Sequence, residues 1–286
     1  MPFKYSVCKS VNKCFPIPVH PFNLENEGKK TYAQWQFEKG EETVRFYLDK
    51  VTKEDIFKDK VVLDIGCGAG GKTLYYASLG AKKVYGLDIV ERYLKESNDL
   101  ANKKGLSNQF EFVLGNAANL QFEGNYFDSI IMNDAMEHVN EPLKVLNECH
   151  RVLKPSGKLY INFPPYFHPF GAHLSDAIGI PWVHLFFDEK TLIQVYKDLV
   201  KEFHDGKQRI NFRISEDEND AEYFSYINRM TIKRFKKLLI HTDYSIFYYN
   251  EIPLRECFKS LSQLPVFKEG FVKMVVCILE KQQKLR

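Results

Sequence analysis

The stretch Val61-Val-Leu-Asp-Ile-Gly-Cys-Gly-Ala-Gly-Gly71 decides the fold. Its first five residues are apolar apart from Asp64, which is typical of a parallel strand that is buried on both faces. The glycines that follow allow a tight turn and let a ligand approach the backbone where a Cβ atom would clash. A helix predicted over 72–79 completes a strand–turn–helix unit. In open α/β sheets, ligands bind at the carboxyl end of such a strand.

On either side of this unit, apolar runs alternate with amphipathic stretches. The predicted strands are 83–87, 110–114, 126–132, 158–163, 244–250 and 271–280, and the predicted helices include 91–104, 142–153 and 231–241. This alternation predicts a Rossmann-like seven-stranded, mostly parallel sheet with helices on both faces. Because the last two strands are joined by a loop, we expect an antiparallel pair at one edge of the sheet.

Four regions are predicted along the chain. Residues 1–55 form an arm and a cap helix, since 1–30 are rich in Pro, Asn and Lys, which predicts an irregular segment, and 32–51 have helical spacing. Residues 56–163 form the core. Residues 164–228 interrupt the strand–helix alternation with four prolines, four histidines and an acidic run, and are predicted to be an inserted lid. Residues 229–286 add a helix and the closing strands.

A carboxylate, Asp88, closes the strand next to the glycine turn. An acid at this position can accept hydrogen bonds from two ribose hydroxyls. Gly66, Gly68 and Gly71 also fit the Gly-x-Gly-x-x-Gly dinucleotide fingerprint. Both nicotinamide enzymes and methyltransferases place an acid here, so these residues indicate an adenosine-type ligand without choosing between the two classes.

Five segments in order over Val61–Phe163 resemble the motifs of class I S-adenosylmethionine-dependent methyltransferases, and in particular the ubiquinone/menaquinone-type small-molecule group. They are Asp64–Gly70, Leu87–Asp88, Gly115–Ala117, Phe127–Val139 and Cys149–Leu159. The resemblance implies an enzyme that transfers a methyl group from S-adenosylmethionine to a small-molecule acceptor. A methyltransferase acting on protein or RNA, and a non-catalytic cofactor-binding protein, remain alternatives. The ordered motifs disfavour a nicotinamide oxidoreductase.

The same resemblance assigns the cofactor-binding residues. The methionine part would lie against Asp64 and the turn Gly66-Cys67-Gly68, and the ribose against Asp88. The residues implied for the adenine are Ile89, Asn116 and Ala117, and the one implied near the sulfonium is Asn133. Many relatives have Asp where this chain has Asn116. The Asn carbonyl can still accept a hydrogen bond from the adenine amine.

Three residues are candidates for the catalytic machinery: His138, His173 and Asp176. Methyl transfer from a sulfonium needs positioning above all, and needs a base only when the acceptor must lose a proton. His138 follows the fourth strand. His173 and Asp176 follow the fifth, and we expect them to line the acceptor pocket. A purely structural role remains open for each.

The histidines of the insertion raise the question of a metal site. The residues that could contribute are His168, His173, Asp176 and His184. Their spacing matches no standard metal-binding pattern, and the chain has no Cys-x-x-Cys pair, so no metal is predicted. Aromatic residues 32, 35 and 37 either cover the sulfonium or pack on the sheet.

Composition and charge exclude several classes of protein. The net charge is +3, without a dense basic stripe, so a nucleic-acid partner is not expected. The N-terminal residues do not form a secretory signal, and no apolar run is long enough to span a membrane. We therefore expect a cytoplasmic protein with free thiols at its six cysteines. The sequence leaves the oligomeric state open.

Overall fold

The computed structural model describes residues 2–265 and 267–283, and its contacts divide the chain into two compact units. The sheet unit consists of Thr31–Phe163, Ile232–Ile252 and Met274–Arg286. The helical unit consists of Met1–Lys30, Pro164–Thr231 and Pro253–Lys273. The outermost residues of the predicted regions, 1 and 284–286, lie outside the described residues.

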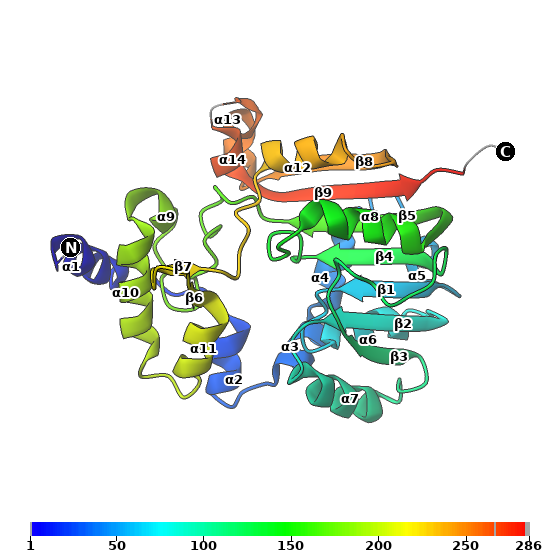
Figure 1. Cartoon of the computed structure of the whole chain (residues 1–286), viewed down its shortest axis with the longest axis horizontal. Helices are drawn as coiled ribbons and strands as arrows, with labels where there is room; N and C mark the ends of the chain where they lie inside the picture. The colour runs from blue at the N-terminus through cyan, green and yellow to red at the C-terminus, as the bar shows by residue number, and fades with distance from the viewer. Residues whose placement is uncertain (1, 266, 284–286) are drawn as a thin grey trace. The chain divides into compact units, whose positions relative to one another are not determined.

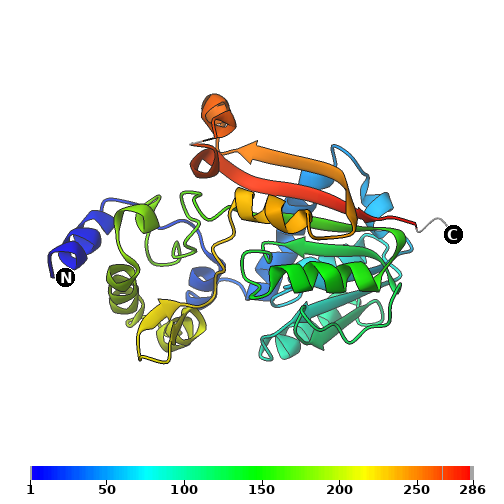
Figure 2. The same cartoon turned by 45° about the horizontal axis from the view of Figure 1, so that its top comes forward.

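The sheet unit contains a seven-stranded sheet in the order β3-β2-β1-β4-β5-β9-β8 (Figure 1). The strands are β1 Val61–Ile65, β2 Lys83–Asp88, β3 Phe110–Leu114, β4 Phe127–Asn133, β5 Leu153–Phe163, β8 Tyr244–Pro253 and β9 Val272–Lys281. Strands β1 to β5 pair in parallel, whereas β9 pairs antiparallel with β5. Figure 2 shows β8 and β9 running in opposite directions. The predicted fold class is therefore confirmed.

Helices cover both faces of this sheet, with α8 in front of the strands and α6 behind them in Figure 1. The helices of the sheet unit are α3 Tyr32–Glu38, α4 Gly40–Val44, η1 Arg45–Tyr47, α5 Lys53–Phe57, α6 Gly71–Ser78, α7 Tyr93–Lys104, α8 Pro142–Val152 and α12 Ile232–Leu239. Four of the five residues of β1 are buried, as expected for a strand with helices on both sides. Helix α7 ends at Gly105, whose φ of 68° only glycine adopts without strain, as the sequence predicts.

Two hydrogen bonds place the glycine turn at the carboxyl ends of β1 and β2. The backbone N–H groups of Gly66 and Cys67 donate to the Leu87 carbonyl, at 2.9 and 3.2 Å. The end of β1 is thereby fixed beside Asp88, the last residue of β2. The two strongest sequence signals thus meet at one edge of the sheet.

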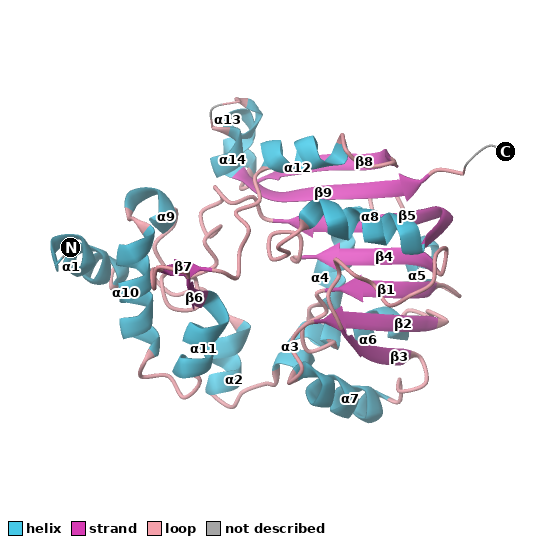
Figure 3. Cartoon of the chain, viewed as in Figure 1, coloured by secondary structure: helices cyan, strands magenta, loops and turns pink. Residues whose placement is uncertain are grey.

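The helical unit is built from short helices and a two-stranded ribbon (Figure 3). Its elements are α1 Pro2–Asn12, α2 Pro21–Asn26, α9 Val183–Phe186, α10 Glu189–Val200, α11 Gly206–Arg213, β6 Ile214–Glu216, β7 Glu222–Phe224, η2 Glu256–Phe258, α13 Lys259–Gln263 and α14 Lys268–Phe271. Its apolar core includes Cys8, Leu192, Val195 and Tyr196.

The prediction that residues 1–30 are irregular is wrong, because this segment contains α1 and α2. Cys8 is fully buried in the helical unit, and the side chain of Asn12 donates to the Ala177 carbonyl and accepts from the Gly179 N–H. The structural division also differs from the predicted boundaries at 55 and 229. Residues 31–55 pack with the sheet, and 253–273 pack with the helical unit.

Two smaller expectations also differ from the structure. The helical stretch expected over 32–51 is divided among α3, α4 and η1. The strand expected over 158–163 begins earlier, at Leu153, and its pairing with β4 shifts register near Ser156, which has a φ of 64°. No helix among the described residues is long and apolar enough to cross a membrane.

Candidate functional site

The glycine turn between β1 and α6 adopts a backbone that other residues avoid. Gly66, Gly68 and Gly70 have φ values of 71°, 55° and 75°. A Cβ atom at Gly66 would lie 2.7 Å from the Cβ of Ala135. Glycine is therefore needed here for conformation and for space.

Helix α3 holds this turn through Gln36, which is 4% exposed. Its side-chain amide donates to the Cys67 carbonyl and accepts from the Gly71 N–H, both at 3.2 Å. The sequence does not predict this contact, because a single Gln in an amphipathic helix carries no local signal of a partner thirty residues away. Tyr32, also on α3, has a ring carbon 3.2 Å from the position of a Cβ at Gly68. One of the aromatic residues considered as a cover thus packs against the turn.

Asp88 is bonded to the same turn. One carboxylate oxygen accepts from the Gly68 N–H at 2.8 Å and the other from the Val90 N–H at 2.9 Å. Burial raises the pKa of this carboxyl, and the backbone N–H groups of Val90, Gly68 and Ile89 lower it. A carboxylate has about four acceptor positions, so each oxygen keeps capacity for a hydroxyl. The next side chain, Ile89, is 72% exposed and offers an apolar surface beside this acid.

Asp64, near the end of β1, is 4% exposed and accepts a hydrogen bond from the Thr73 hydroxyl at 2.5 Å. Burial raises the pKa of this carboxyl to about 7, against the opposing effects of the Thr73 bond and of Lys72. A carboxyl that titrates near neutral pH becomes fully charged when a cation lies beside it. Asp64 is therefore suited to a positively charged ligand group.

The segment after β3 contains Asn116 and Ala117. The side-chain oxygen of Asn116 accepts from the Ala118 N–H at 2.9 Å and so stabilises the turn. Asn116 is exposed, whereas Ala117 is 6% exposed.

Asn133, the last residue of β4, belongs to a buried polar network and is 5% exposed. Its side-chain oxygen accepts from the hydroxyl of Tyr47 and, at 2.7 Å, from the amide of Asn162. Its amide donates to the hydroxyl of Tyr76 at 3.2 Å. The network fixes the orientation of Asn133 at the carboxyl ends of β4 and β5.

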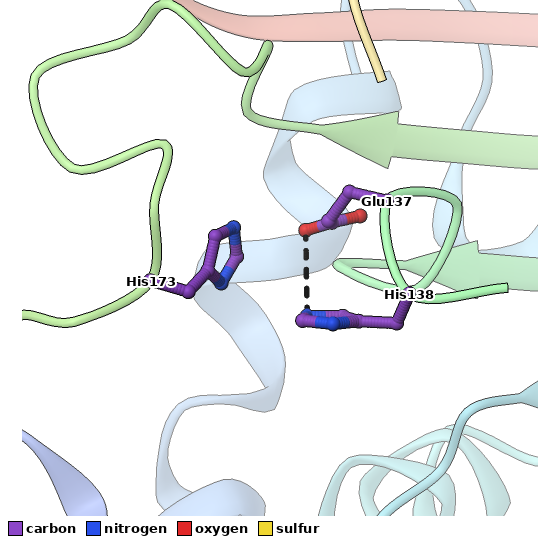
Figure 4. A group of neighbouring side chains, drawn as sticks. All are labelled: Glu137, His138 and His173. Atoms are coloured by element: carbon purple, nitrogen blue, oxygen red, sulfur yellow. Dashed lines mark ion pairs between the residues drawn. The ribbon is translucent and has the colours of Figure 1, made fainter. Parts of the chain in front are cut away.

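Charged and titratable groups follow β4 directly. His138 Nε2 lies 3.9 Å from a carboxylate oxygen of Glu137, and Figure 4 marks this ion pair. Glu137 is 3% exposed. Burial first, and then the charge of Asp134, raise the pKa of Glu137, against Lys72. Asp134 forms an ion pair with Lys72 at 3.1 Å. Glu137 is thus a buried carboxyl with a raised pKa beside the predicted His138.

The structure places Asp176 in the interior of the helical unit. It is 0% exposed, and its two carboxylate oxygens lie 3.1 Å from nitrogen atoms of Arg209 and Arg213. Tyr196 donates a further hydrogen bond at 2.9 Å. The expectation that Asp176 lines an acceptor pocket is therefore corrected: its charge is compensated within the core by two arginines.

The histidines of the insertion have separate surroundings. His173, drawn in Figure 4, has a φ of 51°, and its ring lies 6.5 Å from that of Tyr226. His168 Nδ1 accepts from the Phe170 N–H at 3.2 Å. Burial lowers the pKa values of His168 and His184 to about 4, so both rings are neutral at physiological pH.

The sheet order, the reversed strand β9 and the glycine turn bonded to Asp88 agree with the class I S-adenosylmethionine-dependent methyltransferase fold that the sequence predicts. Residues 63–161 match a family model described as "Methyltransferase domain". This match supports the predicted class of enzyme and cofactor over the matched residues.

Curated relatives agree with this class. The chain is 31% identical over 147 residues to "Tocopherol O-methyltransferase, chloroplastic" from Arabidopsis thaliana, covering 51% of this chain and 41% of that protein. It is 36% identical over 116 residues to "Demethylmenaquinone methyltransferase" from Geobacillus stearothermophilus, covering 40% of this chain and 49% of that protein. The matched stretches span less than half of the length of each relative.

Solved structures share the fold. A SAM-dependent methyltransferase from Methanosarcina mazei superposes with a TM-score of 0.53 at 23% sequence identity, covering 81% of this chain and 96% of that chain. This likeness extends well beyond the 63–161 segment and supports the assigned fold class.

Proposed function

We propose that this protein binds S-adenosylmethionine at the glycine turn and transfers its methyl group to a small-molecule acceptor. The observation that carries the proposal is the hydrogen bond from the Gly68 N–H to Asp88 at 2.8 Å. This bond joins a glycine-rich turn to a carboxylate with remaining acceptor capacity. The two features together suit a ligand with a compact polar end and a ribose.

The residues present fit each part of this cofactor. Asp64, Gly66, Cys67 and Gly68 would hold the methionine part, with the Asp64 carboxyl favouring positive charge. Asp88 would accept from the ribose hydroxyls.

The adenine would pack beside Ile89 and against Asn116 and Ala117. Asn133, oriented by its buried network, would lie near the sulfonium. The bound cofactor supplies a methyl group that is already activated for attack.

The protein's own residues then have to position the acceptor and, where needed, hold a proton. His138 and the buried Glu137 form the pair best suited to this role on the sheet unit, since an adjacent carboxyl can orient an imidazole or share its proton. His173 remains a candidate for contact with the acceptor. The small-molecule acceptor is favoured because the relatives are named for tocopherol and demethylmenaquinone.

Calorimetric titration tests cofactor binding. We expect S-adenosylmethionine and its demethylated product to bind saturably, and NAD not to bind. Asp88→Ala should weaken binding at least tenfold. The control is Asp128→Ala, which removes a carboxylate at the opposite end of the strands and should leave the affinity within about twofold. Absence of any heat with either nucleoside, or equal affinity in the two variants, would contradict the proposal.

Transfer is tested with a methyl-labelled cofactor and a metabolite extract, with mass spectrometry of the labelled product. We expect a labelled small molecule that is lost in His138→Ala if this residue contacts the reacting atoms. His138→Gln separates the two roles of the ring, because Gln can hold a hydrogen bond but cannot act as a base near neutral pH. Label found only in protein or RNA would contradict a small-molecule acceptor.

A further inference from the structure

The helical unit contains a small pocket of about 170 Å³. All of its lining residues belong to the segment Pro164–Thr231. The apolar part of the wall consists of Ala172, Phe187, Leu192, Phe224 and Ile227. An apolar cavity of roughly 150 Å³ is enough to bind benzene. The pocket therefore has room for a single ring with one or two small substituents.

One residue of the wall, His184 on α9, has unused hydrogen-bonding capacity. Both of its ring nitrogens are buried, and neither meets hydrogen-bond geometry with a partner within the described residues. The backbone of Tyr166 acts to raise the pKa of the ring, but burial outweighs it. The His184 ring lies 4.8 Å from the ring of Tyr166 at 55°, so its orientation is set by packing. A buried polar atom left without a partner costs about 1–3 kcal/mol, which a ligand group could recover.

The protonation state of His184 selects the kind of group. Burial lowers its pKa to about 4, so the ring is neutral at physiological pH. A neutral imidazole presents one donor and one acceptor. A hydroxyl group, which also donates and accepts, can pair with either tautomer, whereas a hydrocarbon leaves both nitrogens unpaired.

The charged residues of the wall are already compensated. Arg229 and Glu189 form an ion pair at 2.6 Å, and the second Glu189 oxygen accepts from the Phe224 N–H at 2.8 Å. Asp188 accepts from the Thr191 N–H and pairs with Lys4, each at 2.9 Å.

The phenol of Tyr166 stays neutral, because burial raises its pKa. A charged ligand would thus find no unpaired opposite charge in the pocket, so an uncharged ligand is favoured.

We propose that this pocket binds a small uncharged ring compound that carries one hydroxyl group, through His184 and the apolar wall. The site goes beyond methyl transfer and does not rest on it, since none of its lining residues is among those assigned to the cofactor. Such a pocket would give the helical unit a ligand specificity of its own.

Ligand-observed NMR on the full-length protein, without cofactor, tests the proposal with four probes of similar size: phenol, toluene, benzoate and benzylammonium. We expect saturable binding of phenol, at least fivefold weaker binding of toluene, and no saturable binding of the two ions. Benzoate or benzylammonium binding as well as phenol would overturn the proposal, and so would a failure of phenol to saturate.

Two variants locate the site. Ala172→Leu fills part of the pocket and should weaken phenol binding at least tenfold. His184→Phe keeps a ring but removes the polar atoms, and it should reverse the preference so that toluene binds better than phenol. The matched control is His204→Phe, an exposed histidine of the same unit, which should bind phenol as the parent protein does. Unchanged phenol binding in either pocket variant, with thermal unfolding showing a folded protein, would refute the assignment.

Discussion

Asp64 offers a test in which stability and binding move in opposite directions. Burial raises the pKa of this carboxyl from 3.8 to about 7, against the Thr73 hydrogen bond and Lys72. The folded protein therefore holds a proton that the unfolded chain releases between these two values. The free energy of unfolding should fall as the pH rises through this window and level off above pH 7. The interval corresponds to a loss of up to about 4 kcal/mol.

The substitution Asp64→Asn removes this titration and keeps an acceptor for Thr73. We expect the variant to be more stable than the parent, by about 1.5–2 kcal/mol at pH 5 and about 4 kcal/mol at pH 8. Urea unfolding at the two pH values measures the difference. A gain that does not grow with pH, or a loss at pH 8, would refute the burial argument.

Asp128 is the matched control, because its pKa moves the other way. Burial acts to raise that pKa, but bonds from Lys154 and the Val61 N–H outweigh burial and lower it. Its contribution is present above the unfolded pKa and is lost in acid, so Asp128→Asn should be less stable than the parent at pH 8. The proposed function adds a second readout: Asp64→Asn should weaken S-adenosylmethionine binding at least tenfold while it stabilises the fold.

Four further substitutions, one of them a control, test the turn and the helical core. Gly66→Ala combines a positive φ with a clash at Ala135 and should lower the free energy of unfolding by about 2–4 kcal/mol. Its control is Gly80→Ala, where φ is also positive but no neighbour lies within 4 Å of the added Cβ. In the same urea titration this variant should lose only about 1 kcal/mol. Gln36→Ala leaves two backbone groups of the turn unpaired and should lower the free energy of unfolding by about 1–3 kcal/mol. Hydrogen exchange of the amides in the turn should become faster. Asp176→Asn removes the carboxylate that pairs with buried Arg213 and leaves buried Arg209 with Asp205 alone. It should cost about 3–5 kcal/mol with cofactor affinity unchanged, and an affinity loss in the folded variant would contradict its structural role.

Local signals in the sequence were sufficient to predict the central strands of the sheet unit. The strand at Val61–Ile65 has the predicted bounds, and Asp88 closes its neighbour as expected. These features depend on apolar runs, glycines and an acid within a few residues of one another. The order of the motifs along the chain then predicted the remaining strands of the sheet.

Long-range pairings were the part that the sequence could not provide. Asp176 was predicted to line the acceptor pocket because it follows the fifth strand. Its arginine partners are 33 and 37 residues further along the chain, on one helix. The first thirty residues were predicted to be an irregular arm because they are rich in proline and lysine. They contain two short helices, which are stabilised by packing against the insertion rather than by helix propensity. The contacts of Gln36 with the turn could not be predicted either, because they also join residues far apart in the sequence.

The bond between Gly68 and Asp88 makes the proposed cofactor site a single unit, and this affects how its variants are read. Asp88→Ala would remove an acceptor for ribose and would also release the Gly68 N–H, so weakened binding could have either cause. Gln36→Ala loosens the same turn from its other side, at Cys67 and Gly71, and leaves the acid intact. If the turn's rigidity is what matters, the two variants should lose similar affinity for adenosine alone and for the whole cofactor. If Asp88 also holds the ribose, only Asp88→Ala should abolish binding of adenosine, while Gln36→Ala should weaken the methionine-bearing cofactor more than the nucleoside.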